Sequence, residues 1–119
     1  NLLKREWIQF YDGAPTWDRA DRIIQSWDTA GSRAHLADYT VCTTWKIWGN
    51  DCYLIDVYRK RLDFPALRKV VIKLAQKFRP RNILIEDNGT GQSLLQELYS
   101  DRPAWMTYPT AIIETYINT

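Results

Sequence analysis

A short apolar run that directly follows a helical pattern is the feature that most limits the possible folds. The run is Asn82 to Glu86 (NILIE), and apolar residues before it recur at the 3.6-residue period of an amphipathic helix. Asp63 and Pro65 mark the start of that helix, and Arg79-Pro80 marks its end. A buried strand in this position lies parallel to an earlier strand and is joined to it by a crossover. The pattern therefore predicts an α/β fold.

Three other segments have the composition of strands. Ile23 to Thr29 (IIQSWDT) has apolar residues pointing both ways, which indicates a central strand. Tyr39 to Trp48 and Asp51 to Arg59 are rich in β-branched and aromatic residues. Because Gly49-Asn50 between them supplies turn residues, these two segments are expected to form an antiparallel hairpin.

The last part of the chain predicts a second helix and a weak final strand. Thr90 is expected to cap a helix from Gly91 to about Ser100, with its leucines facing inward. The final strand is expected over Ala104 to Tyr108. The predicted order is therefore strand, two-stranded hairpin, helix, strand, helix, strand.

Length and composition favour one globular unit. The chain has 119 residues, of which 45% are hydrophobic, enough for one core and too few for two ordinary domains. Residues 1–20 show no sustained period and are interpreted as an irregular lead-in. No stretch approaches the ~20 apolar residues of a membrane span, and the N-terminus lacks a signal peptide, so a cytoplasmic location is expected. The chain begins without Met and is expected to be a piece of something longer.

Charge and cysteines add two narrower expectations. The net charge is only +2, but the segment from Arg59 to Arg81 carries many cations and a single acid, Asp63. This segment could contact phosphate, although a solvated helix face is the commoner explanation of such a charge run. Cys42 and Cys52 lack the spacing of a zinc site and are interpreted as reduced core thiols.

Acidic residues stand at the ends of two predicted strands. Asp28 ends the first strand, and Glu86-Asp87 ends the fourth. If these strands are parallel neighbours, the acids meet at one edge of the sheet, where Mg²⁺ or Mn²⁺ would offset their repulsion. In the alternative interpretation the acids serve only as turn or cap residues, with Asp87-Asn88-Gly89 forming a turn. A phosphate-binding loop is disfavoured, because no Lys follows the glycines.

Four segments together resemble the nuclease domain of bacteriophage terminase large subunits: Ser26–Ala30 (SWDTA), Asp38–Trp45 (DYTVCTTW), Tyr53–Val71 (YLIDVYRKRLDFPALRKVV) and Ile83–Leu98 (ILIEDNGTGQSLLQEL). The resemblance implies a ribonuclease H-like mixed sheet with flanking helices, in which strands 1 to 3 are antiparallel and strands 4 and 5 are parallel. It also implies that Asp28 and Glu86 are catalytic and bind metal, with Asp87 as the alternative metal ligand. Asp38 is a further candidate for organising metal or water, and a role as a surface turn residue is the alternative. His35 is interpreted as an ordinary loop residue.

The chain departs from the family in its last part. Members of the family supply a third acid from a late helix, and nothing after Arg102 matches it; Glu114 is a poor substitute. The resemblance therefore implies a truncated nuclease domain over residues 21–119. The lead-in, residues 1–20, resembles the linker that leaves an ATPase domain absent from this chain. A missing late helix would expose one face of the sheet, so a homodimer that covers this face is expected.

Three functions follow from these observations. The first is a metal-dependent endonuclease that cuts concatemeric double-stranded DNA during phage or prophage genome packaging, with Arg59, Lys60, Arg61 and Lys73 binding DNA. In full terminases its partners are the ATPase domain, the small subunit and the portal. The second is an inactive prophage remnant that keeps the fold and binds DNA or a partner. The third is another ribonuclease H-like activity, such as a Holliday-junction resolvase or a transposase.

Overall fold

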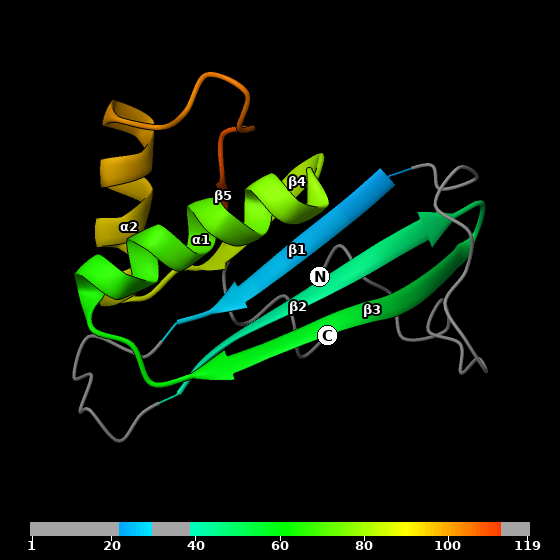
Figure 1. The fold of residues 1–119 in the computed structure, drawn as a ribbon, viewed down its shortest axis with the longest axis horizontal. Coiled ribbons are helices and arrows are strands. Elements are labelled where there is room, and N and C mark those ends of the chain that lie inside the picture. Colours follow the sequence, from blue (N-terminus) through cyan, green and yellow to red (C-terminus); the bar gives the residue numbers. More distant parts are fainter. Residues whose placement is uncertain (1–21, 30–38, 113–119) are drawn as a thin grey trace.

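A mixed sheet of five strands forms the centre of the molecule, as a computed structural model shows for residues 22–29 and 39–112 (Figure 1). The strand order is β3-β2-β1-β4-β5, in which β2 is antiparallel to both of its neighbours and β4 is parallel to both of its own. The elements are β1 (Arg22–Asp28), β2 (Thr40–Trp48), β3 (Asp51–Lys60), α1 (Phe64–Phe78), β4 (Asn82–Glu86), α2 (Gly89–Ser100) and β5 (Thr110–Ile112). The predicted α/β, ribonuclease H-like arrangement of antiparallel strands followed by parallel ones is confirmed.

Local sequence explains the boundaries of the hairpin and of α1. Gly49 adopts a positive φ of 61° in the turn between β2 and β3, a conformation that costs glycine little. Asp63 caps α1, because its Oδ1 accepts a hydrogen bond from the Ala66 backbone N–H at 2.9 Å. The helix ends at Arg79, which adopts the left-handed conformation of a C-cap. The predicted limits of α1 are therefore confirmed.

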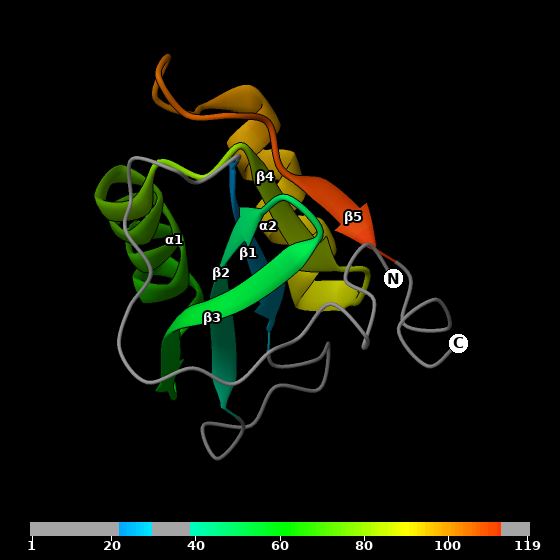
Figure 2. The same ribbon diagram turned by 90° about the vertical axis from the view of Figure 1, so that its right-hand side faces the viewer.

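Both helices pack against the same face of the sheet, termed here the helix face. Trp27 of β1 and Ile85 of β4 share a buried cluster there with residues of α1 and α2. The apolar residues of the helices in this cluster are Leu67, Val71, Leu74, Ala75, Leu94, Leu95 and Leu98. Figure 2 shows α1 and α2 beside the sheet, with β5 next to β4. Because α1 connects β3 to β4, the burial of α1 on this face packs the hairpin and the parallel strands into one core.

The opposite side of the sheet, termed the second face, has its own apolar cluster. Ile24, Ile47, Cys52 and Leu84 form this cluster, and Ile24 and Leu84 are each only 2% exposed. The expectation of an exposed sheet face is therefore wrong for these positions, which are buried within a single chain. Val57, which lies on the same face through its pairing with Thr43, is 54% exposed, so the burial does not extend over the whole face and the homodimer stays a prediction.

Two expected details near the end of the chain are also wrong. The cap of α2 is Asn88 and not Thr90, so the helix begins two residues earlier than expected, at Gly89. The last strand is β5, at Thr110–Ile112, and not Ala104–Tyr108. Two backbone carbonyls of that earlier segment, those of Ala104 and Met106, instead accept hydrogen bonds from Arg102 Nη1, as does the Pro103 carbonyl just before the segment.

The two cysteines are buried free thiols, as predicted. Cys42 belongs to the cluster on the helix face and Cys52 to the cluster on the second face, so they lie on opposite sides of the sheet. Within the described part of the chain, no helix is long and apolar enough to cross a membrane.

Candidate active site

Asp28 and Glu86 lie side by side at one edge of the sheet. The parallel pairing of β1 with β4 runs up to Trp27 opposite Ile85, and Asp28 and Glu86 are the next residue on each strand. Neighbouring strands are about 5 Å apart, so these two backbones are neighbours at the carboxyl ends of β1 and β4. This edge is where polar groups from parallel strands converge in α/β sheets.

Both acids point to the second face, away from the helices. Trp27 and Ile85 are part of the helix-face cluster, and successive side chains on a strand alternate between faces. Asp28 and Glu86 must therefore share the opposite face. Asp28 is exposed and Glu86 is half-buried, so a solvated ion or a phosphate can reach the pair.

Asp87 has a different environment from Glu86. Its Oδ1 accepts a hydrogen bond of 2.8 Å from Gln92 Nε2, which directs the carboxylate toward α2. Its backbone N–H donates to the Ile112 carbonyl, which joins β4 to β5. Of the two acids at the end of β4, Glu86 is therefore the one that shares a row and a face with Asp28.

The side chain of Asn88 connects the ends of β1 and β4. Its Nδ2 donates to the Thr29 carbonyl at 3.1 Å, and its Oδ1 accepts from the Thr29 hydroxyl at 3.2 Å. The same Oδ1 accepts from the Gly91 backbone N–H at 2.8 Å and so caps α2. One side chain thus ties together the residue after Asp28, the residues after Glu86 and the start of a helix.

Gly91 lets α2 start directly against the Glu86 backbone. A Cβ atom at this position would lie 2.1 Å from the Glu86 carbonyl oxygen, well inside contact distance. It would also lie 3.2 Å from Cγ2 of Ile85. Glycine is therefore required at position 91, because the backbone of α2 comes too close to that of β4 for a side chain. This contact places the first turn of α2 against the backbone of Glu86.

The proposed DNA-binding residues fall into two groups. Arg59 pairs with Val41, which pairs with Asp28, so Arg59 lies in the row of the acids and on the second face. The guanidinium of Arg59 lies 3.5 Å above the Tyr39 ring, and that of Arg61 lies 4.6 Å from the same ring. Cation–π contacts of this kind restrict a guanidinium without neutralising it.

Lys60 and Lys73 are placed differently from the two arginines. Lys60 alternates with Arg59 on β3 and pairs with Thr40, so its side chain points to the helix face. Lys73 is exposed on α1. Of the four residues, only Arg59 is therefore placed in the row of the acids, and Arg61 shares the Tyr39 ring with it.

The acid pair is compatible with a divalent cation. Mg²⁺ is commonly held by one or two protein carboxylates, with water and phosphate oxygens completing its shell. Within residues 22–29 and 39–112, no group of three or more His, Cys, Asp or Glu side chains gathers to hold a metal. Asp38, His35 and Glu114 lie outside the described residues.

Sequence reasoning missed the residues that support the acids. An Asn just before a helix is a recognised capping signal, so the role of Asn88 at α2 could have been found. The contact of Asn88 with Thr29 spans 59 positions and has no local signal. Gln92 and Tyr39 are likewise identified only by the contacts that the fold brings about.

Comparisons with known proteins give a matching family and similar solved structures. The family model described as a terminase RNaseH-like domain matches residues 25–111. No curated protein matches the sequence. Two solved structures of a PPX-GPPA enzyme from Aquifex aeolicus are similar, at 12% and 13% identity and a TM-score of 0.49 for each. They cover 77% and 78% of this chain, which spans only 36% and 35% of theirs.

Proposed function

The chain belongs to the family of terminase RNase H-like domains, and on this premise we propose that it is a metal-dependent DNA endonuclease domain. Its reaction would be hydrolysis of a phosphodiester bond in concatemeric double-stranded DNA, during genome packaging by a phage or prophage. Membership of the family supports a terminase nuclease-type domain in general. Metal dependence, the DNA substrate and the packaging role are the parts that we propose.

The observation that carries the proposal is the shared row of Asp28 and Glu86. The two acids follow the last paired residues of adjacent parallel strands and point to one face. Carboxylates that share one face at the ends of neighbouring strands repel each other, and a cation between them would offset this repulsion. RNase H-like nuclease domains generally use divalent metals, and hard oxygen ligands suit Mg²⁺ or Mn²⁺.

Each residue at this edge has a proposed role. Asp28 and Glu86 would hold the cation, which supplies Lewis acidity toward a phosphate oxygen and lowers the pKa of a bound water. Asp87, held by Gln92, would act as an outer ligand through water. Arg59 and Arg61 would contact the DNA backbone next to the acids, whereas Lys60 and Lys73 would add a weaker, general attraction.

The partners follow from the same premise. Double-stranded DNA is the proposed substrate, and an ATPase domain, a small terminase subunit and a portal are the partners proposed for a full-length terminase. A homodimer is a separate expectation, and light scattering at high protein concentration tests it. A monomer at all concentrations would exclude it.

A plasmid-nicking assay with Mg²⁺ or Mn²⁺ tests the endonuclease. We expect Asp28→Asn and Glu86→Gln to lower the nicking rate at least about a hundredfold. Asp87→Asn should have a smaller effect, because its carboxylate is directed toward α2. Glu97→Gln is the matched control, since it removes an exposed carboxylate of α2 that is paired with Arg68. Nicking that is unchanged in Asp28→Asn would exclude the proposed site.

A second candidate is an inactive domain that keeps the fold and binds DNA or a partner. The observation in its favour is that only a pair of acids converges at this edge among the described residues, whereas two metals need more ligands. Duplex binding by a protein that nicks DNA with neither metal would support this candidate. Cleavage confined to four-way junctions would instead indicate a resolvase-like activity.

A further inference from the structure

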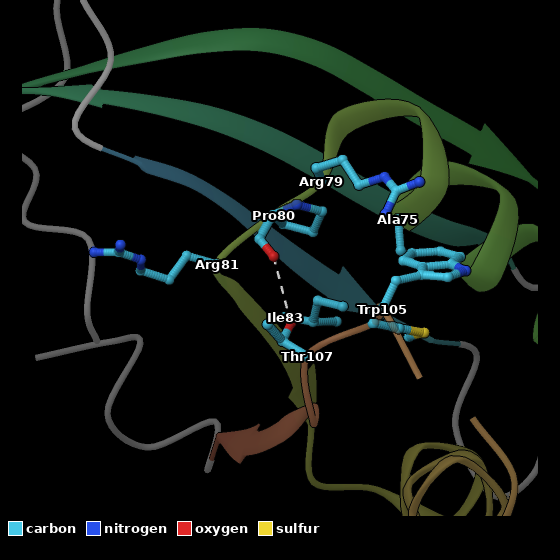
Figure 3. Close-up of a pocket in the computed structure, with 8 residues that line it drawn as sticks. Ala75, Arg79, Pro80, Arg81, Ile83, Trp105 and Thr107 are labelled. Atoms are coloured by element: carbon cyan, nitrogen blue, oxygen red, sulfur yellow. Dashed lines mark hydrogen bonds between the residues drawn. The ribbon is translucent and has the colours of Figure 1, made fainter. Parts of the chain in front are cut away.

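A pocket opens at the sheet edge opposite the acids. It has a volume of about 270 Å³ and lies between the end of α1, the start of β4 and the connection from α2 to β5. Its floor is apolar and includes Ala75, Ile83 and Met106. Trp105 and Arg79 stand at its mouth (Figure 3). Because β4 starts at this end and Glu86 ends the strand at the other, a ligand here would not be the phosphate that the acids contact.

The walls of the pocket are fixed by hydrogen bonds and packing. Thr107 Oγ1 donates to the Pro80 carbonyl at 3.3 Å and ties the loop to the segment after α1 (Figure 3). Arg102 donates to carbonyls of the same loop, and Met106 is only 3% exposed. The loop is therefore anchored on both sides of Trp105, and this residue is still 39% exposed.

Arg79 occupies a backbone conformation that favours glycine. Its φ is 51°, and no other described residue except Gly49 has a positive φ. Glycine is the usual residue at this left-handed position after a helix, and another side chain there raises the energy by about 1 kcal/mol. The guanidinium lies 4.3 Å from the centre of the Trp105 ring. An arginine at this costly position puts a cation beside an exposed indole at the mouth of the pocket.

The lining has a cationic and an apolar character and contains no acid. Besides Arg79, the stem of Arg81 lines the pocket, and its side chain extends outward, away from Trp105 (Figure 3). We propose that this pocket docks an acidic peptide segment of a protein partner, with one large apolar side chain inserted and flanking carboxylates on Arg79 and Arg81. Tryptophan and arginine are the residues that most often dominate such contacts.

The size and position of the pocket favour a peptide over a nucleic acid. Pockets that take a whole small-molecule ligand usually start at about 300 Å³, so this one suits a single side chain. One face of Trp105 already carries the Arg79 guanidinium, which leaves less room for a stacked base. A base of duplex DNA would also have to leave its stack to enter the pocket, at an energetic cost.

Fluorescence anisotropy with labelled short peptides tests the proposal on the full chain. The probe is a peptide with one phenylalanine between aspartates, and the reference probe has lysines in place of the aspartates. We expect the acidic probe to bind the wild type and the basic probe not to bind. Arg79→Gly should weaken binding of the acidic probe about tenfold while keeping or raising the melting temperature, because glycine relieves the backbone cost. Trp105→Ala should weaken it similarly.

Lys69→Ala is the charge-matched control, because Lys69 is exposed on α1 and does not line the pocket. Its affinity for the acidic probe should stay within about twofold of the wild type. No binding by the wild type, or equal binding by wild type and Arg79→Gly, would overturn the proposal. Single-stranded oligothymidylate that binds with the same dependence on Arg79 and Trp105 would overturn it in favour of a nucleic-acid site.

Discussion

The Asn88 amide donates a hydrogen bond of 3.1 Å to the Thr29 carbonyl, across a gap of 59 positions in the sequence. Thr29 follows Asp28, and Asn88 lies two residues after Glu86. The bond therefore holds the two acid-bearing strand ends together beyond the last pair of the β1–β4 ladder. The same side chain caps α2, so a change at this one position affects the spacing of the acids and the start of a helix.

Asn88→Ser separates these two roles. Serine is a good N-cap and should still accept from the Gly91 N–H, but it is too short to bond Thr29. We expect the free energy of unfolding to fall by about 1–2 kcal/mol, because the buried Thr29 carbonyl loses its partner. The Mn²⁺ concentration needed for half-maximal nicking should rise. Ser93→Ala, which removes only a local bond to Gly89, is the control. An unchanged metal requirement in Asn88→Ser would mean that the bond serves stability alone.

Gly91→Ala should destabilise the protein, although alanine normally favours a helix over glycine by about 1 kcal/mol. The added Cβ would lie 2.1 Å from the Glu86 carbonyl oxygen, so α2 must move away from β4. Urea denaturation should show a loss of about 1–3 kcal/mol. Gly49→Ala is the comparison, since a Cβ there meets nothing within 4 Å and only the positive φ opposes it. A Gly91→Ala protein as stable as the wild type would contradict the close approach.

Cys42 should make stability fall at alkaline pH. Burial, the main cause, raises the pKa of its thiol to about 12 from an ordinary value of 9.0, with Asp56 adding to the shift and a hydrogen bond with Thr44 opposing it. A raised folded-state pKa means that this contribution is fully present below about pH 9 and is lost as the pH rises toward about 12. In that window the thiol should reduce the free energy of unfolding by about 1.4 kcal/mol per pH unit.

Urea denaturation of wild type and Cys42→Ala at several pH values measures this effect. The variant should be less stable at neutral pH, because it leaves a cavity in the helix-face cluster, but its stability should decline less steeply above about pH 9. The same slope in both proteins would show that another group causes the alkaline loss.

Arg59→Ala should weaken duplex binding more than Lys73→Ala does. Arg59 lies on the second face in the row of Asp28, whereas Lys73 is exposed on α1, which packs against the helix face. We expect Arg59→Ala to reduce the slope of log affinity against log salt by about 1, as for the loss of one phosphate contact. Titrations of labelled duplex at several salt concentrations measure this slope. Equal effects of the two substitutions would indicate that DNA lies across the helices instead.

The strand ends and helix limits were largely predictable, because their signals are local. The 3.6-residue period predicted α1, and Gly49-Asn50 predicted the hairpin turn. The adjacency of Asp28 and Glu86 was predicted on the condition that β1 and β4 are parallel neighbours, and the sheet meets this condition. The errors occurred where side chains compete for backbone groups. Asn88 and not Thr90 caps α2, and Arg102 donates to two carbonyls of the segment expected to be the last strand.

The sequence by itself determined the order of elements and the presence of an acid at the end of β1 and of β4, because periodicity and turn chemistry act over a few residues. Only the tertiary structure decided which acid of β4 shares a face with Asp28, that Arg59 lies in the same row, and that Asn88 bonds Thr29. It also decided that Ile24 and Leu84 are buried on the second face, contrary to the expectation of an exposed surface. These outcomes depend on strand register and on contacts between residues far apart in the chain, which no local pattern of residues encodes.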